Sequence, residues 1–217
     1  MASSPSAPKD MTTTTQEKPI FFGPFEVTSQ VFLKTPSTFA LVNLKPLLPG
    51  HVLICPLAPH RRLTDLSSPE LVDLWETVQV VQRMLARYYF SPSPSSSPSE
   101  RCELGSFNIA VQDGPEAGQT VPHVHVHVIP RIKGSTAKSV ETPSDELYER
   151  MAAEDGNVGG ALWDRLILKK RPEPSGRFPA IEDADRKARD LKDMQDEAGI
   201  YRGILKEMGE EEGDSGE

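Results

Sequence analysis

Residues 119–130, QTVPHVHVHVIP, place three of the chain's five histidines at every second position, with valines between them. Side chains of a β-strand point alternately to opposite faces of the sheet. The run therefore predicts a strand with three histidines on one face and three valines on the other: His123, His125 and His127, and Val124, Val126 and Val128. Pro122 and Pro130 are predicted to mark its ends, because proline cannot donate to an interior ladder.

The histidine face is predicted to be functional. Imidazoles destabilise one another when they are protonated, and they are costly to bury without hydrogen-bond partners. A row of three is therefore a poor way to stabilise a fold. The valine face, in contrast, is expected to join the core.

The rest of the chain predicts an antiparallel α+β domain. Four further apolar segments read as strands: VFLKT (31–35), FALVN (39–43), GHVLICPL (50–57) and SFNIAVQ (106–112). One long helix is expected over 69–89, with Ser67 and Glu70 as a capping box. Its buried stripe is predicted at Leu71, Leu74, Trp75, Val78, Val81 and Leu85. A C-terminal helical pattern carries Ala184, Ala188, Leu191 and Met194, and YRGIL (201–205) follows it. Strands joined by hairpins around one helix favour α+β over a doubly wound sheet.

Composition divides the chain into a domain and its extensions. Residues 1–18 are rich in Ser, Thr and Pro and are expected to be disordered, as is the acidic tail 207–217. The domain is expected over 19–206, with SPSPSSSPSE (91–100) as a flexible Ser/Pro insertion. The net charge of −8 is concentrated at the end, since residues 182–217 hold 13 acidic and 6 basic residues. The nearly neutral body lacks the basic stripe of a nucleic-acid-binding surface.

No segment approaches the ~20 apolar residues of a membrane span, and the N-terminus lacks the basic and apolar regions of a signal peptide. We expect no membrane association and a cytoplasmic location, with the nucleus as a second compartment. Two cysteines are too few for a disulfide framework, and Cys55 is expected to be a reduced packing residue.

The histidine face suits either a metal or a phosphate. Zinc binding by all three histidines conflicts with their spacing, because positions i and i+4 of a strand lie roughly 13 Å apart. Phosphate chemistry fits better. A histidine can attack phosphorus if one ring nitrogen is free and the other N–H is held by an acceptor, and neighbouring imidazoles can donate to phosphoryl oxygens. His125, with a histidine on either side, is then the expected nucleophile.

The loop before the histidines supports phosphate chemistry. DGPEAGQT (113–120) contains glycines that let backbone amides approach a phosphate closely. Gln112, Gln119 and Thr120 offer neutral polar contacts around it.

These segments together resemble the histidine triad superfamily. HVHVHV matches its signature, and QDGPEAGQTV resembles the branch of fragile histidine triad-type dinucleoside polyphosphate hydrolases. The resemblance extends over residues 20–135 and more loosely to the C-terminal helix. It implies a five-stranded antiparallel sheet with one long helix and a C-terminal helix, and a homodimer that joins two such sheets.

The resemblance also implies the roles of individual residues. His125 resembles the family's nucleophile, supported by His123 and His127. His51 resembles an additional phosphate-site histidine and Gln112 a contact to the scissile phosphate. Substrate contacts are further implied for Asn43, Gln119 and Thr120, with Phe22 and Gly23 near the adenine. His60 lies outside the pattern and is expected to be an exposed loop residue.

The implied activity is cleavage of diadenosine triphosphate to AMP and ADP through a nucleotidyl-histidine. Two alternatives stay open: hydrolysis of adenosine phosphoramidates or nucleotidyl transfer on the same fold, and a nucleotide-binding signalling module with slow turnover. No tightly bound cofactor is expected. A divalent cation, Mg²⁺ or Mn²⁺, is expected at most as a companion of the polyphosphate, because the chain shows no carboxylate cage.

Overall fold

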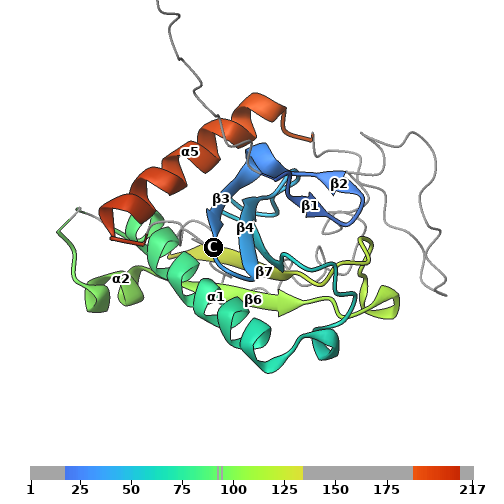
Figure 1. Ribbon diagram of the computed structural model, residues 1–217. Helices are drawn as coiled ribbons and strands as arrows, with labels where there is room; N and C mark the ends of the chain where they lie inside the picture. Colours follow the sequence, from blue (N-terminus) through green and yellow to red (C-terminus); the bar gives the residue numbers. More distant parts are fainter. Residues whose placement is uncertain (1–17, 92, 94, 134–187, 211–217) are drawn as a thin grey trace, which may run out of the picture.

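The computed structural model describes residues 18–91, 93, 95–133 and 188–210 of the 217-residue chain. A five-stranded antiparallel sheet in the order β3-β4-β5-β7-β6 forms its body, beside a two-stranded hairpin β1-β2 (Figure 1). The strands are β1 (Phe21–Phe22), β2 (Phe25–Glu26), β3 (Val31–Lys34), β4 (Thr38–Val42), β5 (Val52–Pro56), β6 (Gly105–Val111) and β7 (Val126–Ile132). The helices are α1 (Ser68–Tyr89), α2 (Pro98–Leu104) and α5 (Leu191–Glu207), with short 3-10 turns η1 (Thr28–Gln30), η2 (Leu63–Asp65) and η3 (Pro115–Ala117). The predicted α+β fold is confirmed.

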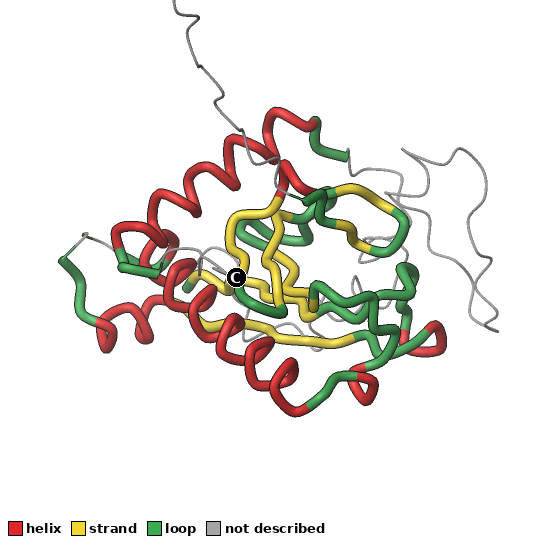
Figure 2. Tube along the Cα trace, in the orientation of Figure 1, coloured by secondary structure: helices red, strands yellow, loops and turns green. Residues whose placement is uncertain are grey.

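The register of the strands separates two faces of the sheet. Val52 and Ile54 of β5 pair with Val128 and Val126 of β7, so these four side chains share one face. His127 pairs with Leu53 and lies on the other face. Helix α1 packs on β4, β5 and β7, and α5 packs on β3 and α1. Figure 2 shows α5 along the upper left of the strands, α1 along their lower side and the hairpin β1-β2 at the upper right.

Helix α1 begins as the sequence predicts. The Glu70 carboxylate accepts the backbone N–H of Ser67 at 2.9 Å and its hydroxyl at 2.6 Å, which satisfies donors at the first turn. The buried stripe is shifted from the predicted one, however: Leu74, Thr77, Val78, Val81, Met84 and Leu85. Trp75 is 39% exposed, so the prediction that it packs in the core is wrong. It lies about 100° around the helix from Leu74, at the margin of the stripe.

The histidine strand is shorter at its start and longer at its end than predicted. β7 runs from Val126 to Ile132, so Pro122 and Pro130 do not bracket it, and only His127 of the three histidines lies in the ladder. Pro130 is tolerated because β7 pairs with β5 only as far as Val128, whereas its pairing with β6 extends to Ile132. At Pro130 the strand thus has one neighbour, which is the edge situation that suits proline. The three valines are fully buried, as predicted.

The sequence predicted a flexible loop over the whole Ser/Pro insertion, but part of the insertion is helical. Its last residues begin α2, where Ser97 is the N-cap and its hydroxyl accepts the Glu100 N–H at 3.3 Å. The Glu100 carboxylate accepts the Ser97 N–H at 2.6 Å in return. A capping box therefore starts a helix within a segment whose composition indicated a flexible linker.

Helix α5 begins later than its pattern suggested. Asp190 caps it by accepting the Asp193 N–H at 2.7 Å, so Ala188 precedes the helix. YRGIL lies inside α5 and does not follow it. The disordered tail predicted over 207–217 does not begin at Glu207, which ends α5, and Glu210 pairs with Arg83 at 3.0 Å. Ala184, residues 1–17 and residues 211–217 lie outside the described part of the chain.

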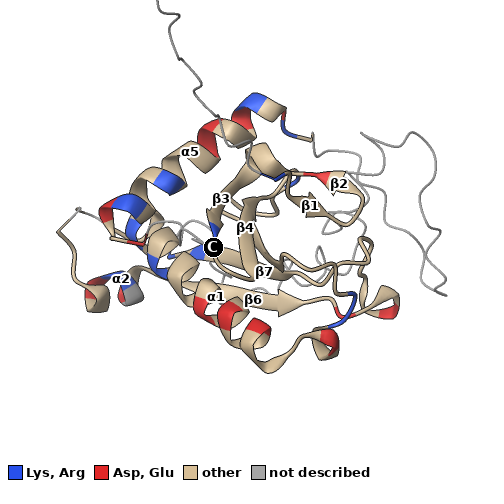
Figure 3. Cartoon of the chain, in the orientation of Figure 1, with Lys and Arg blue, Asp and Glu red and all other residues tan. Residues whose placement is uncertain are grey.

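Charged side chains gather on the helices and turns, and the strands are almost free of them (Figure 3). Cys55 is fully buried in β5, as predicted, and burial raises the pKa of its thiol well above the ordinary value. Among the described residues, no helix has the length and apolar character that crossing a membrane requires.

Candidate active site

The three histidines form a buried row, and Phe22 of the hairpin β1-β2 packs against two of them. The rings of His125 and His127 stand edge to face with centroids 4.9 Å apart. Phe22 packs edge-on against His125, with ring centroids 5.1 Å apart, and at a tilt of 41° against His123, with centroids 5.6 Å apart. Each histidine is at most 3% exposed. The row is therefore shielded from bulk water, which strengthens electrostatic interactions made within it.

The sheet brings the other predicted residues toward this row. Ala110 of β6 pairs with His127 and Val111 pairs with Val126, so Gln112 directly follows the last paired residue of β6. Likewise, the pairing of Leu41 with Leu53 continues to Asn43 and His51, which flank the connection between β4 and β5. Antiparallel pairing thus explains how positions far apart in the sequence meet on one face.

His123 is an anchor. Its Nδ1 accepts the Gly23 N–H at 3.0 Å, so its Nε2 carries the proton and donates to the Pro56 carbonyl at 2.8 Å. Both nitrogens are used by the backbone, and the prediction that His123 donates to a phosphoryl oxygen is therefore wrong. Burial lowers the pKa of His123, which favours this neutral form. The two backbone partners carry no side-chain signal that sequence reasoning could have used.

His125 has the arrangement that a nucleophile requires. Its Nδ1–H donates to the main-chain carbonyl of His123 at 2.9 Å, which leaves the lone pair on Nε2. The described residues place no hydrogen-bond partner on that Nε2. Burial lowers the pKa of His125 to about 4, so the ring is neutral at pH 7.

His51 and His127 form a hydrogen-bonded pair that places a hydrogen on Nε2 of His127. The Leu47 N–H donates to Nδ1 of His51 at 3.1 Å, so the proton of His51 is on Nε2, which lies 3.0 Å from Nδ1 of His127. His127 accepts there and must carry its own proton on Nε2. That buried Nε2 has no hydrogen-bond partner in the described structure. Burial also holds the pKa of His127 well below its ordinary value.

The same proton positions argue against a metal among these rings. His123 has no free lone pair, and the partners of His51 and His127 assign both of their Nε2 atoms to protons. His125 alone presents a lone pair, whereas a zinc site needs three or four ligands. Within the described ranges no group of three His, Cys, Asp or Glu residues is arranged to hold a metal ion.

The glycine-rich loop is fastened from outside by the turn after β5. Arg62 donates through Nη1 to the Asp113 carbonyl, and the Leu63 N–H donates to the Asp113 carboxylate at 2.9 Å. Gly114 has φ of 118°, and a Cβ there would lie 1.5 Å from Arg62 Nη1. Only glycine allows this approach.

The predicted substrate contacts lie at the edges of the row. The Gln119 amide nitrogen donates to the Arg61 carbonyl at 2.9 Å, which fixes its side chain. Gln112 lies beside Gly118, whose missing side chain leaves room for the Gln112 amide. Asn43 is buried, with Nδ2 3.3 Å and 3.4 Å from the two ring nitrogens of His51. Thr120 is half-buried in the same loop as Gln119.

The two residues expected near adenine have different surroundings. Phe22 is fully buried against the histidines, so its role in this structure is packing. Gly23 lines a pocket of about 430 Å³ together with His123. The other walls are Lys18, Pro19, Ile20, Phe21, Lys34, Leu57 and Pro59.

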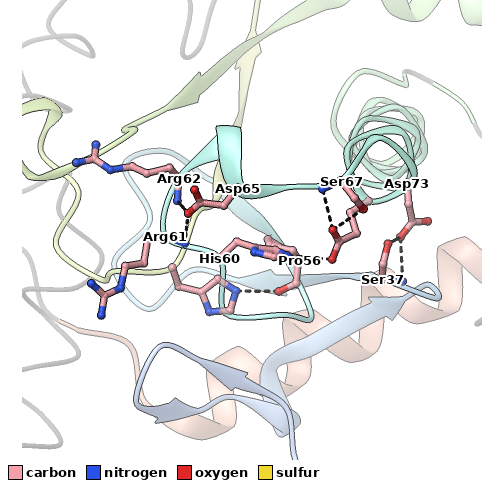
Figure 4. A network of polar contacts seen from close by, with 10 residues as sticks. Ser37, Pro56, His60, Arg61, Arg62, Asp65, Ser67 and Asp73 are labelled. Carbon is pink, nitrogen blue, oxygen red and sulfur yellow. Dashed lines mark hydrogen bonds and ion pairs between the residues drawn. The ribbon is translucent and has the colours of Figure 1, made fainter.

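His60 is not the exposed loop residue that the sequence predicted. Its side chain is 25% exposed, and Nε2 lies 3.0 Å from the Glu70 carboxylate. Its carbonyl accepts the Val124 N–H at 2.7 Å, which ties the segment after β5 to the triad. Figure 4 shows His60 beside Pro56, and Asp65, whose carboxylate accepts the backbone N–H groups of Arg61 and Arg62. The segment around His60 therefore supports the triad from outside.

Comparison with known families and proteins gives a consistent result. The HIT domain family model matches residues 24–134. The chain is 40% identical over 198 residues to the Schizosaccharomyces pombe protein named bis(5'-nucleosyl)-tetraphosphatase [asymmetrical], covering 90% of this chain and 99% of that one. It is 44% identical over 148 residues to the Saccharomyces cerevisiae bis(5'-adenosyl)-triphosphatase, covering 68% of this chain and 62% of that one.

Solved structures share the fold. The Caenorhabditis elegans NitFhit protein superposes with a TM-score of 0.54 and 28% identity, over 88% of this chain and 31% of that one. The Plasmodium falciparum diadenosine triphosphate hydrolase, solved with cyclomarin A, also gives a TM-score of 0.54, at 22% identity, over 89% of this chain and 88% of that one.

Proposed function

Because the chain belongs to the HIT domain family, we propose that it hydrolyses dinucleoside polyphosphates, cleaving diadenosine triphosphate to AMP and ADP with His125 as the nucleophile. The observation that carries this proposal is the distribution of ring protons. Hydrogen bonds leave an acceptor lone pair on His125 Nε2 and a donor hydrogen on the neighbouring His127 Nε2. A nucleophile next to an unused donor is what in-line attack on a phosphoryl group requires.

In the first half of the reaction, His125 Nε2 attacks the α-phosphorus. A nitrogen–phosphorus bond forms, the bond from phosphorus to the bridging oxygen breaks, and ADP leaves with the bonding electrons. The ring becomes positively charged, and the His123 carbonyl that accepts its Nδ1–H stabilises this charge. ADP is a good leaving group, so the step needs little acid assistance.

His127 is proposed to stabilise the charge that develops on the phosphoryl oxygens. Its Nε2–H is buried and has no partner in the described protein, so a phosphoryl oxygen would gain a strong hydrogen bond there. Gln112, which directly follows β6, is proposed to supply a neutral donor beside His125. In the second half, water attacks the nucleotidyl-histidine, releases AMP and loses a proton to solvent, which restores His125.

The relatives support this class of substrate. The Schizosaccharomyces pombe protein is named a tetraphosphatase and the Saccharomyces cerevisiae protein a triphosphatase. An Arabidopsis thaliana relative, 37% identical over 185 residues, is named a bifunctional bis(5'-adenosyl)-triphosphatase/adenylylsulfatase. All three act on a nucleotide with an anhydride-linked phosphate. We propose the triphosphate as the preferred substrate.

The cation and the oligomeric state are further parts of the proposal. The donor set of the row does not suit a resident metal, and we propose that Mg²⁺ or Mn²⁺ enters with the polyphosphate. In the described structure β6 pairs only with β7, so its outer edge is open. An open edge favours pairing with another strand, which supports a homodimer formed through β6. The cytoplasmic location stays a prediction of the sequence.

The test is product analysis with wild-type protein and His125→Asn. Purified protein is incubated with diadenosine triphosphate, diadenosine tetraphosphate and adenosine phosphoramidate, with and without Mg²⁺ and a zinc chelator. We expect AMP and ADP from the triphosphate, resistance to the chelator and loss of turnover in His125→Asn. Full turnover in that variant would refute the nucleophile, and preference for the phosphoramidate would refute the substrate.

A further inference from the structure

Arg189 joins the C-terminal helix to the strand end that carries Asn43. It lies just before α5, outside the segment matched by the family model. Its Nε donates to the Asn43 carbonyl at 3.2 Å and its Nη2 donates to the same oxygen. Its backbone N–H donates to the Leu44 carbonyl at 3.1 Å. Three donors of one residue thus hold the backbone immediately after β4.

The guanidinium is itself held in place. Its Nη1 lies 2.6 Å from the Glu197 carboxylate, and both side chains are mostly buried, at 22% and 18% exposed. Glu197 also accepts the Tyr201 hydroxyl at 2.7 Å, which lies 3.1 Å from the Tyr89 hydroxyl of α1. A planar guanidinium with a carboxylate on one side and a carbonyl on the other has one orientation, so the position of Asn43 is fixed from α5.

From Asn43 the polar contacts continue to the reacting ring. The Lys45 N–H donates to Asn43 Oδ1 at 3.0 Å, which turns the NH₂ group toward His51. His51 in turn donates to His127, and the ring of His127 contacts that of His125. A shift of the Asn43 backbone would therefore move His51 and change the direction of the donor hydrogen on His127.

We propose that Arg189 is a positioning residue for the active site, acting through Asn43 and His51 to keep His127 in the tautomer that donates from Nε2. The C-terminal helix thereby belongs to the catalytic apparatus, although it supplies no group that touches substrate. The inference rests on the proposed function for its kinetic consequence. Its structural consequence, the tautomer of two rings, is independent of substrate.

Arg202 offers a matched control on the same helix. Its Nη1 donates to the Val31 carbonyl of β3 at 2.6 Å, so it also fastens α5 to the sheet through one backbone oxygen. Val31 pairs with Leu41 on the edge strand β3, which β4 and β5 separate from the histidine strand β7. Arg189→Gln and Arg202→Gln remove the same charge, and each removes a guanidinium bond from α5 or its N-terminal flank to a backbone carbonyl, at Asn43 and at Val31.

The kinetic arm compares kcat and KM for the triphosphate. A misplaced catalytic group costs up to roughly a hundredfold in rate, and we expect Arg189→Gln to lower kcat by about tenfold or more with a smaller change in KM. Arg202→Gln should lower the melting temperature comparably and keep kcat within about twofold of wild type. Arg189→Lys, which keeps one donor, should recover part of kcat.

The spectroscopic arm uses full-length protein with ¹⁵N-labelled histidine and needs no substrate. Two-bond ¹H–¹⁵N correlations distinguish protonated from unprotonated ring nitrogens. We expect His51 and His127 to be Nε2–H tautomers in wild type and in Arg202→Gln, and mixed or exchanging in Arg189→Gln. Wild-type kcat and unchanged tautomers in Arg189→Gln would overturn the inference, and Arg189 would be only a structural anchor.

Two outcomes separate this inference from the proposed function. Wild-type protein that hydrolysed none of the substrates, with tautomers that changed only in Arg189→Gln, would refute the proposed hydrolysis. The effect of Arg189 on the ring tautomers would still be supported. If Arg189→Gln did not fold, Glu197→Gln would replace it, because it frees the guanidinium while leaving the donors in place. Glu197→Gln is then expected to show the same tautomer change and a several-fold lower kcat, and wild-type values in it would contradict the proposal.

Discussion

Nε2 of His51 lies 3.0 Å from Nδ1 of His127, and the proton between them belongs to His51. The Leu47 amide fixes this assignment, since it can donate only to an unprotonated Nδ1. The direction of this backbone N–H, with the Asn43 amide beside it, thus determines which ring nitrogen of His127 carries the hydrogen. Each ring of the pair carries a single hydrogen, so this hydrogen bond forms between two neutral imidazoles.

Replacing His51 by Asn should reduce turnover while leaving the nucleophile in place. Without the His51 N–H, His127 is free to adopt the tautomer that has no donor at Nε2. We expect kcat to fall by roughly tenfold to a hundredfold, with the nucleotidyl-histidine still detectable after a rapid alkaline quench, which preserves its acid-labile nitrogen–phosphorus bond. His60→Asn is the control, because His60 pairs with Glu70 outside the row. Equal losses in the two variants would contradict the assignment.

His123→Ala should act mainly on stability. It leaves the Gly23 N–H and the Pro56 carbonyl without their partner, and each buried orphan costs about 1–3 kcal/mol. We expect the free energy of unfolding in urea to fall by about 2–5 kcal/mol. Residual kcat should exceed that of His125→Asn when both are assayed well below their melting temperatures. A fully stable but inactive variant would mean that His123 contacts substrate after all.

Stability should fall as the solution becomes acidic. Burial lowers the pKa of His125 from 6.5 to about 4 in the folded protein. Between these values the unfolded chain binds a proton that the folded chain does not, so the free energy of unfolding decreases as pH drops from 6.5 toward 4 and levels off below it. A single such shift amounts to about 3 kcal/mol.

Urea unfolding at several pH values measures this effect, and His123 and His127 add to it in the same direction. His125→Asn should make the profile shallower, because one of the depressed groups is gone. An unchanged slope in this variant would show that His125 is not neutral in the folded protein at acid pH.

Gly118→Ala should disturb the loop beside the row. Gly118 has φ of 91°, and a Cβ would lie 2.7 Å from Gln112 Nε2. We expect about 1–3 kcal/mol of destabilisation from the backbone strain and a lower kcat/KM from displacement of the Gln112 amide. Gly203→Ala in α5 is the control. No atom lies within 4 Å of its Cβ, so it should be neutral or stabilise by up to about 1 kcal/mol. Wild-type kcat/KM in Gly118→Ala would exclude Gln112 from catalysis.

The sequence predicted the fold where a local pattern has a single meaning. Alternation of His and Val identified the two faces of the row, and the pair Ser67 and Glu70 identified the start of α1. The pair Ser97 and Glu100 has the same spacing and starts α2, but the Ser/Pro composition around it favoured a loop. A capping signal can therefore outweigh composition, because it satisfies specific backbone donors.

The sequence could predict which residue types make up the candidate site, but it could not predict which ring nitrogens carry a hydrogen. Pattern alone could not show that Gly23 and Pro56 occupy both nitrogens of His123, since backbone groups are the same in every residue. Pro130 and Trp75 were misplaced for a related reason. Whether a position is paired on one side or lies at the margin of a stripe depends on neighbours distant in the chain. Arg189 is separated from Asn43 by 146 residues, and no local pattern links them.

Within the described ranges the Nε2 hydrogen of His127 has no partner, so stability and turnover are expected to make competing demands on this side chain. An isolated buried donor destabilises the empty protein by about 1–3 kcal/mol. An apolar side chain of similar volume would remove that cost, so screening variants only for heat resistance should select against His127. Product-like anions that accept from its Nε2 should, in turn, raise the melting temperature of wild type more than that of such variants. The most heat-resistant forms of this protein are then expected to be the least active ones.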